Sequence, residues 1–326
     1  MQIGNIDLGP QALFLAPMED VTDASFRFIC KAFGADMLYT EFVSSDGLTR
    51  EAQKTVAKLQ IYEEERPIGI QLYGHIQEAM VEAAKMAEAA KPDLLDLNFG
   101  CPVHKIAQRG AGAGMLRNPE ALVAMTRAIV QAVSCPVTVK TRLGWDEDHK
   151  IIVELAEQLQ DVGIAALTIH GRTRAQLYKG EADWSLIGEI KRNPRMHIPI
   201  IGNGDISSPQ GAKEAFERYG VDGIMIGRAT YGRPWIFQEI KHYLQTGVLL
   251  PEPTVAERVV LAKKHFAKSV EVKGPRIGLL EMRRHLSCYF KGLPNFKEMR
   301  LALVTENDPE KIPKLLDCVA EQWNFK

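Results

Sequence analysis

The sequence predicts a (β/α)8 TIM barrel followed by a small C-terminal helical domain. Eight short apolar runs alternate with helical stretches, and after Pro251 and Pro253 only helical patterns continue. Eight β/α alternations are the pattern of this barrel. The eight runs are residues 12–16, 36–40, 68–72, 94–98, 137–140, 167–170, 198–202 and 223–226.

The segments between the runs carry helix signals, and the turns argue against the rival fold. Asn118 followed by Pro119 is an N-cap and first-turn pair, and Gly163 closes a helix that begins near Ile152. A doubly wound sheet would place a glycine-rich loop directly after its first strand, whereas Leu15 runs into Ala-Pro-Met. The later glycines lack the dinucleotide spacing; they are Gly110, Gly112 and Gly114.

The two prolines separate a barrel domain, residues 1–250, from a helical domain, residues 251–326. Helices are expected in the second domain at residues 255–272, 276–290 and 312–323. From Arg258 to Arg300 the chain has eleven basic and three acidic residues, in a protein of net charge −1. A solvated helix face usually explains such a run, but the scarcity of acids favours an anionic partner such as a phosphate backbone. Both explanations remain open at this stage.

The composition fits a globular protein of a reducing compartment. The chain has 326 residues, 46% of them hydrophobic. Its cysteines are odd in number and form no CxxC pair, which argues against a disulfide framework and against a zinc or iron–sulfur site. The N-terminus lacks signal-peptide features, and no apolar run reaches the roughly 18 residues of a membrane span. We therefore expect a cytoplasmic protein with no metal, no membrane contact and no obligate protein partner.

The most informative stretch surrounds Cys101, in the sequence Asn-Phe-Gly-Cys-Pro at 98–102. It follows a buried strand, which Gly100 and Pro102 terminate. The thiol is thus presented just past a strand's carboxyl end, where α/β folds place their chemistry. A lone cysteine is more often a small buried hydrophobe, but glycine, proline and asparagine are poor core neighbours.

Polar, glycine or proline residues follow nearly every predicted strand. In a barrel these ends meet at one mouth, so we expect their side chains to converge. Each has an ordinary structural explanation alone, as a helix cap or a satisfied core residue. The residues are Pro17, Met18, Glu41, Gln71, Asn98, Cys101, Lys140, His170, Asn203, Asp205, Gly227 and Arg228.

Two of these positions indicate particular chemistry. The glycine turns at Gly204 and Gly227 follow the last two strands, where barrels bind phosphate through backbone N–H groups, and Arg228 adds a fork-shaped donor. Lys140 ends an apolar strand, and burying an unpaired lysine is costly. It could be a Schiff-base nucleophile or a cation facing developing negative charge; the residues alone do not separate the two.

Several motifs carry a resemblance to a known family. They are Ala-Pro-Met at 16–18, Asn-Phe-Gly-Cys-Pro at 98–102 with its glycine tail, Lys-Thr-Arg-Leu-Gly-Trp at 140–145, Ile-His-Gly-Arg-Thr-Arg at 169–174, Asn-Gly-Asp at 203–205, Gly-Arg at 227–228 and Gly-Arg-Pro-Trp-Ile-Phe at 232–237. With these motifs the chain resembles the tRNA-dihydrouridine synthases, and is most similar to the bacterial B branch. Arg283, Arg284, His285 and Tyr289 extend the resemblance into the tail.

The resemblance implies an FMN-binding barrel with a C-terminal helical domain that binds tRNA. By position, FMN would be held by Pro17, Met18, Gln71, Lys140, His170, Asn203, Gly204, Asp205, Gly227 and Arg228. The residues implied to contact the substrate are Asn98, Arg142 and Arg172 at the uracil, and Arg283 and Arg284 on the tRNA. Glu19 departs from the family pattern, because many members have a small residue there.

The implied activity is reduction of the C5–C6 double bond of specific D-loop uridines in tRNA. NADPH would reduce FMN, the flavin N5 would pass hydride to C6, and Cys101 would protonate C5. A thiol of ordinary pKa, about 8.5, is protonated at neutral pH and can act as an acid. The uridine must leave its stack to reach the flavin.

Three rival functions are weighed against this one. A flavin barrel acting on a small pyrimidine, such as a dihydroorotate or dihydropyrimidine dehydrogenase, would not need the basic tail. An aldolase would use Lys140 as its nucleophile. An RNA-binding module that does no catalysis would need neither Cys101 nor Lys140, so the presence of both weighs against it.

Overall fold

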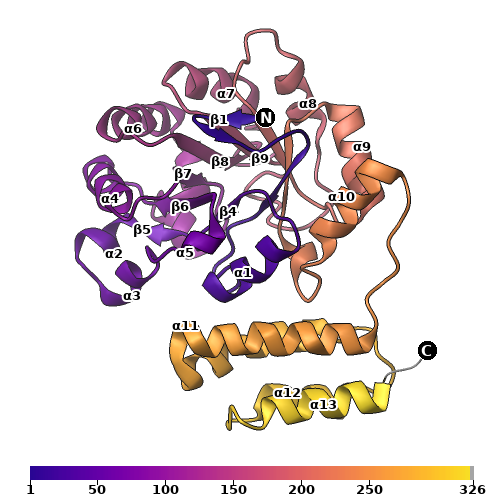
Figure 1. The fold of residues 1–326 in the computed structure, drawn as a ribbon. Helices are drawn as coiled ribbons and strands as arrows, with labels where there is room; N and C mark the ends of the chain where they lie inside the picture. Colours follow the sequence, from indigo (N-terminus) through magenta and orange to yellow (C-terminus); the bar gives the residue numbers. More distant parts are fainter. Residues whose placement is uncertain (324–326) are drawn as a thin grey trace.

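The computed structural model describes residues 1–323 and shows a parallel barrel with a separate layer of helices beside it (Figure 1). The barrel strands are β3 (Ala12–Leu15), β4 (Leu38–Tyr39), β6 (Ile68–Tyr73), β7 (Leu94–Phe99), β8 (Val137–Arg142), β9 (Ala166–His170), β10 (Ile200–Asn203) and β11 (Gly223–Ile226). They lie in the order β3-β11-β10-β9-β8-β7-β6-β4, and a parallel bridge from Phe14 to Met37 brings the two ends together. The predicted TIM barrel is confirmed.

The floor of the barrel is closed by its own N-terminus. Strands β1 (Gln2–Ile3) and β2 (Ile6–Asp7) form an antiparallel hairpin. Ile3 is fully buried in a cluster with residues of the strands' amino-terminal halves, including Phe14 and Leu94. The short strand β5 (Val43–Ser44) adds to the far end of β6. The opposite end, where the strands finish, is left for a site.

Helices cover the outside of the barrel and begin where the sequence signals indicate. Asn118 caps α6 by accepting a hydrogen bond from Ala121 N, and Ser208 caps α9 in the same way. The covering elements are α1 (Ala24–Ala32), α2 (Ser45–Thr49), α3 (Gln53–Ala57), α4 (Gln77–Ala89), α5 (His104–Gln108), α6 (Pro119–Ala132), α7 (Ile152–Asp161), α8 (Ser185–Arg192), α9 (Pro209–Tyr219) and α10 (Ile236–Thr246), with 3-10 turns η1 (Glu63–Glu65), η2 (Gly112–Arg117) and η3 (Arg228–Thr230).

The C-terminal helices form the separate layer that Figure 1 draws below the barrel. Helix α11 (Val255–Tyr289) consists of two arms that meet at Gly274, whose φ of 78° is non-helical; the two predicted helices correspond to these arms. Helix α13 (Ile312–Trp323) was also predicted. Helix α12 (Lys297–Thr305) was not, because it buries only Leu303 and so lacks an apolar stripe.

The helical layer has its own core and a defined contact with the barrel. Its buried cluster includes Phe266, Leu286 and Tyr289, together with Trp235 from the barrel side. At the contact, the Phe26 ring of α1 packs against both His265 and His285, at ring-centroid distances of 5.5 and 4.5 Å, and the two imidazoles lie 4.6 Å from each other. None of the helices within residues 1–323 is long and apolar enough to cross a membrane.

Candidate active site

The strand ends open into a cavity of about 580 Å³, a size typical of ligand and cofactor sites. Thirteen residues singled out from the sequence line it. They are Pro17, Met18, Gln71, Asn98, Cys101, Lys140, Arg142, His170, Asn203, Gly204, Asp205, Gly227 and Arg228. Arg172, Arg283 and Arg284 are not among the lining residues.

The loop that carries Cys101 is held by the residue that ends the strand before it. Asn98 Oδ1 accepts hydrogen bonds from the N–H groups of Gly100 and Cys101, at 3.0 and 2.9 Å. The glycine tail packs underneath: Gly112 has a φ of 55°, and a Cβ there would lie 3.0 Å from the Cys101 Cβ. The close approach explains why a glycine follows at this distance from the cysteine.

The Cys101 side chain faces the cavity but is largely shielded, with 8% exposure. Burial raises the pKa of the thiol above its usual value, although Arg142 and Lys140 nearby oppose the shift. A thiol with a raised pKa remains protonated at neutral pH. Such a thiol can act as a proton donor.

Lys140 lies on β8 directly beside Asn98 of β7 in the strand register. Its Nζ donates a hydrogen bond to Asn203 Oδ1 at 3.2 Å. Burial lowers its pKa to about 8, and the neighbouring Arg142 adds to the shift, while Asp96 opposes it. The ammonium group has no ion-pair partner among residues 1–323, so it adds a poorly compensated positive charge to the cavity.

A cluster of cations surrounds His170 at the end of β9. Burial lowers the pKa of His170 well below its usual value, and Arg142, Lys140, Arg172 and Arg228 push it further in the same direction. The imidazole is therefore neutral. It can donate or accept a hydrogen bond in the cavity without adding to the positive charge there.

Arg172 does not face the cavity that the resemblance assigned to it. Its guanidinium is 1% exposed and binds Asp205 Oδ1 and Oδ2 at 2.9 and 2.6 Å. Arg228 also donates to Asp205 Oδ1, at 3.0 Å. Burial acts to raise the pKa of Asp205, but the Arg172 contact holds it below the usual value. Arg172 thus stabilises the turn after β10 through its two hydrogen bonds to Asp205.

The turns after β10 and β11 present backbone N–H groups to the cavity. Gly204 and Asp205 have φ values of 124° and 56°, which turn successive amides to one side. The amides of Gly204, Asp205 and Gly227 have no acceptor within the described part of the chain. Such a concave set of free N–H groups binds anions, and the Arg228 guanidinium stands beside it. The phosphate site predicted at the last two strands stays a prediction, and these free amides are the groups that it would use.

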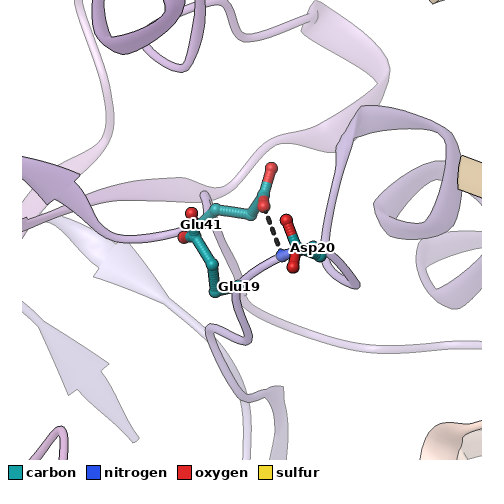
Figure 2. Close-up of side chains that lie close together, drawn as sticks. All are labelled: Glu19, Asp20 and Glu41. Carbon is teal, nitrogen blue, oxygen red and sulfur yellow. Dashed lines mark hydrogen bonds between the residues drawn. The ribbon is translucent and has the colours of Figure 1, made fainter. Parts of the chain in front are cut away.

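The loop after β3 forms the opposite wall. Met18 N donates to Thr22 Oγ1 at 2.9 Å, which holds Pro17 and Met18 at the cavity. Figure 2 shows the next residues, Glu19 and Asp20, beside Glu41, whose Oε1 accepts from Asp20 N at 2.6 Å. The Glu19 carboxylate pairs with Lys58, although Glu19 is also among the lining residues. The main-chain N–H and C=O of Met18 are bonded to Thr22 and Val21 within the same turn.

Arg283 and Arg284, predicted to bind tRNA, have their donors engaged within the protein. Arg284 donates to the carbonyl oxygen of Asp20 at 2.7 Å, so it ties the helical layer to the cavity wall. Arg283 donates to the carbonyl oxygen of Glu306 and to Asn307 Oδ1, both at 2.9 Å. Both side chains hold protein segments together in this structure.

Aromatic residues at the cavity went unrecognised in the sequence. Tyr178 is 54% exposed and lies below the Arg228 and Arg142 guanidinium groups, at 4.8 and 5.7 Å from its ring centroid. Phe42 meets Tyr73 edge to face at 5.2 Å. These residues sit in irregular loops without periodic signal. Their place in the sequence just after a motif or strand end is the one hint that could have indicated them.

The fold and the site together define a barrel with glycine turns, a half-buried lysine and a shielded thiol around one cavity. The model of the dihydrouridine synthase (Dus) family matches residues 14–324. The chain belongs to this family. The predicted family resemblance is thereby confirmed.

Individual relatives agree with the family assignment. A probable tRNA-dihydrouridine synthase of Rickettsia conorii is 38% identical and covers 100% of this chain and 99% of its own length. A tRNA-dihydrouridine synthase B of Pseudomonas aeruginosa is 41% identical, covering 89% and 87%.

Solved structures with a similar fold are much more distant in sequence. A 2-naphthoyl-CoA reductase complex has a TM-score of 0.58 at 13% identity, covering 74% of this chain and 51% of its own. A morphinone reductase variant in complex with tetrahydroNAD has a TM-score of 0.55 at 14% identity, covering 79% and 92%. At these identities the likeness concerns the barrel fold.

Proposed function

We propose that this protein is an FMN-containing synthase that reduces uridine in tRNA to dihydrouridine, with NADPH as the reductant. The observation that carries the proposal is the meeting of three features in one cavity: a protonated Cys101, the cationic Lys140 and the amide nest at Gly204 and Gly227. Family membership supplies the reaction class. A Lys140 aldolase would not need the loop that holds the Cys101 thiol, and family membership disfavours it.

The residues present fit FMN. Its phosphate matches the nest at Gly204, Asp205 and Gly227 with the Arg228 guanidinium, because a nest and a fork-shaped donor both suit a phosphate. The rest of FMN would be held by other residues that line the same cavity. Its contacts would come from Pro17, Met18, Gln71, Lys140, His170 and Asn203.

A bound reduced flavin supplies the hydride for C6 of the uracil. Lys140 places positive charge where the ring system carries negative charge, which stabilises that state without reorganisation. Cys101 donates its thiol proton to C5 as negative charge develops there. The resulting thiolate regains a proton from solvent, since the raised pKa of Cys101 favours the protonated form.

The uracil would enter from the open side of the cavity after leaving its stack in the RNA. Asn98 and the Arg142 guanidinium line that space, and Phe42 and Tyr178 offer aromatic faces on which a base can stack. Arg142 Nε donates to the carbonyl oxygen of Gly100 at 2.8 Å, so it also supports the loop beneath the thiol. Arg172 acts on the site through Asp205.

The helical domain, residues 251–326, would bind the rest of the tRNA. Six of its eleven basic residues between 258 and 300 are bound to acidic residues or chain oxygens, for example Arg258 to Glu252 and Lys263 to Asp317. Five have no acidic partner within residues 1–323 and are the candidates for phosphate contacts. They are Lys264, Arg276, Lys291, Lys297 and Arg300.

Two measurements test the proposal. The purified protein should show flavin absorbance and release FMN on denaturation, and it should form dihydrouridine on unmodified tRNA with NADPH. Free uridine at the same nucleoside concentration should react far more slowly, because it lacks the phosphate contacts. A colourless protein that cannot be reconstituted with FMN would contradict the cofactor, and equal reduction of free uridine would favour the small-pyrimidine rival.

A further inference from the structure

A buried carboxylate lies beneath the site in a layer of polar residues inside the barrel. Asp96 of β7 is flanked in the strand register by Gln71 of β6 and Thr138 of β8. All three are buried, and Asp96 is 1% exposed. Asn98 occupies the next layer up, beside Lys140. An acid at such a depth is costly, and apolar side chains fill this layer in most barrels.

The carboxylate fixes the direction of its neighbour's amide. Asp96 Oδ2 accepts from Gln71 Nε2 at 2.6 Å, and Oδ1 accepts from Thr138 Oγ1 at 2.6 Å. Burial raises the pKa of Asp96 to about 6, while the Gln71 and Thr138 hydrogen bonds oppose the shift, so it is ionised at neutral pH. An ionised carboxylate only accepts hydrogen bonds. Gln71 must therefore turn its NH2 toward Asp96 and its oxygen toward the site.

The orientation of the Gln71 amide determines that of Asn98, and Asn98 in turn holds the loop that bears the Cys101 thiol. Gln71 Oε1 accepts from Asn98 Nδ2 at 2.9 Å. With its NH2 thus engaged, Asn98 turns its Oδ1 toward the N–H groups of Gly100 and Cys101. A glutamine or asparagine amide has almost the same shape in either orientation. The chain of bonds needs one fixed end to select an orientation, and Asp96 provides it.

We propose that Asp96 is a positioning residue for Cys101: it sets the orientation of Gln71, through it that of Asn98, and thereby the loop conformation that aims the thiol into the cavity. The role of the thiol as proton donor rests on the proposed function. The hydrogen-bond chain and its effect on the loop stand on geometry alone, so the two can be tested apart.

The variants Asp96→Leu and Asp96→Asn separate positioning from packing. Leucine has nearly the shape of aspartate but accepts no hydrogen bond, so Gln71 and Asn98 lose their fixed orientation. Asparagine can still accept from Gln71 through Oδ1 while its NH2 donates to Thr138 Oγ1, because the Thr138 hydroxyl can donate to the Leu95 carbonyl oxygen, 3.5 Å away. Thr138→Val removes the other donor to Asp96 but keeps the Gln71 contact, so it tests whether a change elsewhere in this layer reaches Cys101.

The first readout does not depend on activity. Cys101 is 8% exposed, so its alkylation by iodoacetamide, followed by peptide mass spectrometry, reports how firmly the loop is held. We expect Asp96→Leu to raise this rate about tenfold, because the bonds from Gln71 and Asn98 no longer hold the loop in its shielded position. Asp96→Asn and Thr138→Val should leave it near wild type, and the rate at Cys288 should not change in any variant.

The second readout is dihydrouridine formation. Asp96→Leu should slow this step about 100-fold, the cost of misplacing a reacting group by roughly 1 Å. In a Cys101→Ala background Asp96→Leu should cause no further loss. An unchanged alkylation rate at Cys101, or an equal loss in the Cys101→Ala background, would overturn the proposal. A wild-type protein that forms no dihydrouridine would refute the proposed function and leave the alkylation test decisive for Asp96.

Discussion

Two half-buried lysines show how differently the barrel mouth and the barrel–helix contact use charge. Lys273, at the contact, pairs with Asp23 and Glu281; burial opposes the charge, but these acids raise its pKa above the usual value. Lys140, at the mouth, has Arg142 beside it, and its pKa is lowered to about 8 by burial and by that neighbour. A cation paired with acids stabilises the fold. A cation placed beside other cations, such as Lys140, lowers the stability of the fold. Such a perturbed group indicates a functional site, here one that binds an anionic ligand.

Removing the paired lysine should have the largest effect on stability. Lys273→Met leaves Asp23 buried without its partner; although burial raises the pKa of Asp23, Lys273 is the leading group that holds it well below its usual range. Breaking a buried pair in this way costs about 3 kcal/mol. Urea unfolding of the flavin-free protein should show this loss, and a difference below about 0.5 kcal/mol would contradict the pairing.

Removing the unpaired lysine, Lys140, should instead raise the free energy of unfolding. Lys140→Met deletes a poorly compensated buried charge, so flavin-free protein should gain about 1–2 kcal/mol, less than the full desolvation gain because Asn203 Oδ1 loses its donor. The same variant should bind FMN more weakly and reduce tRNA more slowly. A loss of stability in Lys140→Met would contradict the claim that Lys140 destabilises the fold whereas Lys273 stabilises it.

The pH dependence of stability should separate the two sites further. Between pH 8 and about 10.4, the ordinary lysine pKa, folded protein with Lys140 binds fewer protons than unfolded protein. Stability attributable to Lys140 should therefore rise with pH across this window. Lys273 has a raised pKa, so its contribution is complete below about 10.4 and is lost as pH rises through the folded value. Urea midpoints of the wild type and both variants between pH 7.5 and 10 would test these opposite slopes.

The same distinction predicts which cations of the helical domain bind RNA. Replacing Lys291, Lys297 and Arg300 with glutamine should weaken tRNA binding and flatten the salt dependence of the affinity by about two to three units in log–log slope. Replacing Arg258 and Lys263, which are paired with Glu252 and Asp317, is the matched control and should leave the slope almost unchanged. Filter binding from 50 to 200 mM salt would distinguish the sets, and equal effects would mean that pairing does not remove a cation from RNA binding.

The barrel and most of its cavity were predictable because strand ends in this fold converge on one mouth. Residues such as Cys101 and Lys140 could be placed there once the alternation of strands and helices was recognised. The contacts of Arg172 and Arg284 could not, because they depend on Asp205 and on the carbonyl oxygen of Asp20, groups brought near only by the fold.

The helical domain was less predictable for a physical reason. Several of the acids that neutralise its basic stretch come from outside that stretch, as with Asp23 for Lys273 and Asp317 for Lys263. A count of charges along the chain therefore overestimates how many cations of this stretch are free to bind an anionic partner. Asp96 was missed for a related reason, since within an apolar run it reads as a strand residue and only the register places it beside Gln71.

The most direct test of the account separates the two halves of the reaction. Protein whose flavin has been reduced with NADPH is mixed anaerobically with unmodified tRNA, and flavin reoxidation and dihydrouridine are measured together. We predict one dihydrouridine per flavin reoxidised, with Cys101→Ala slowing this half-reaction by about 100-fold or more while reduction by NADPH is unchanged. Reoxidation by tRNA at the wild-type rate in Cys101→Ala would contradict the central claim.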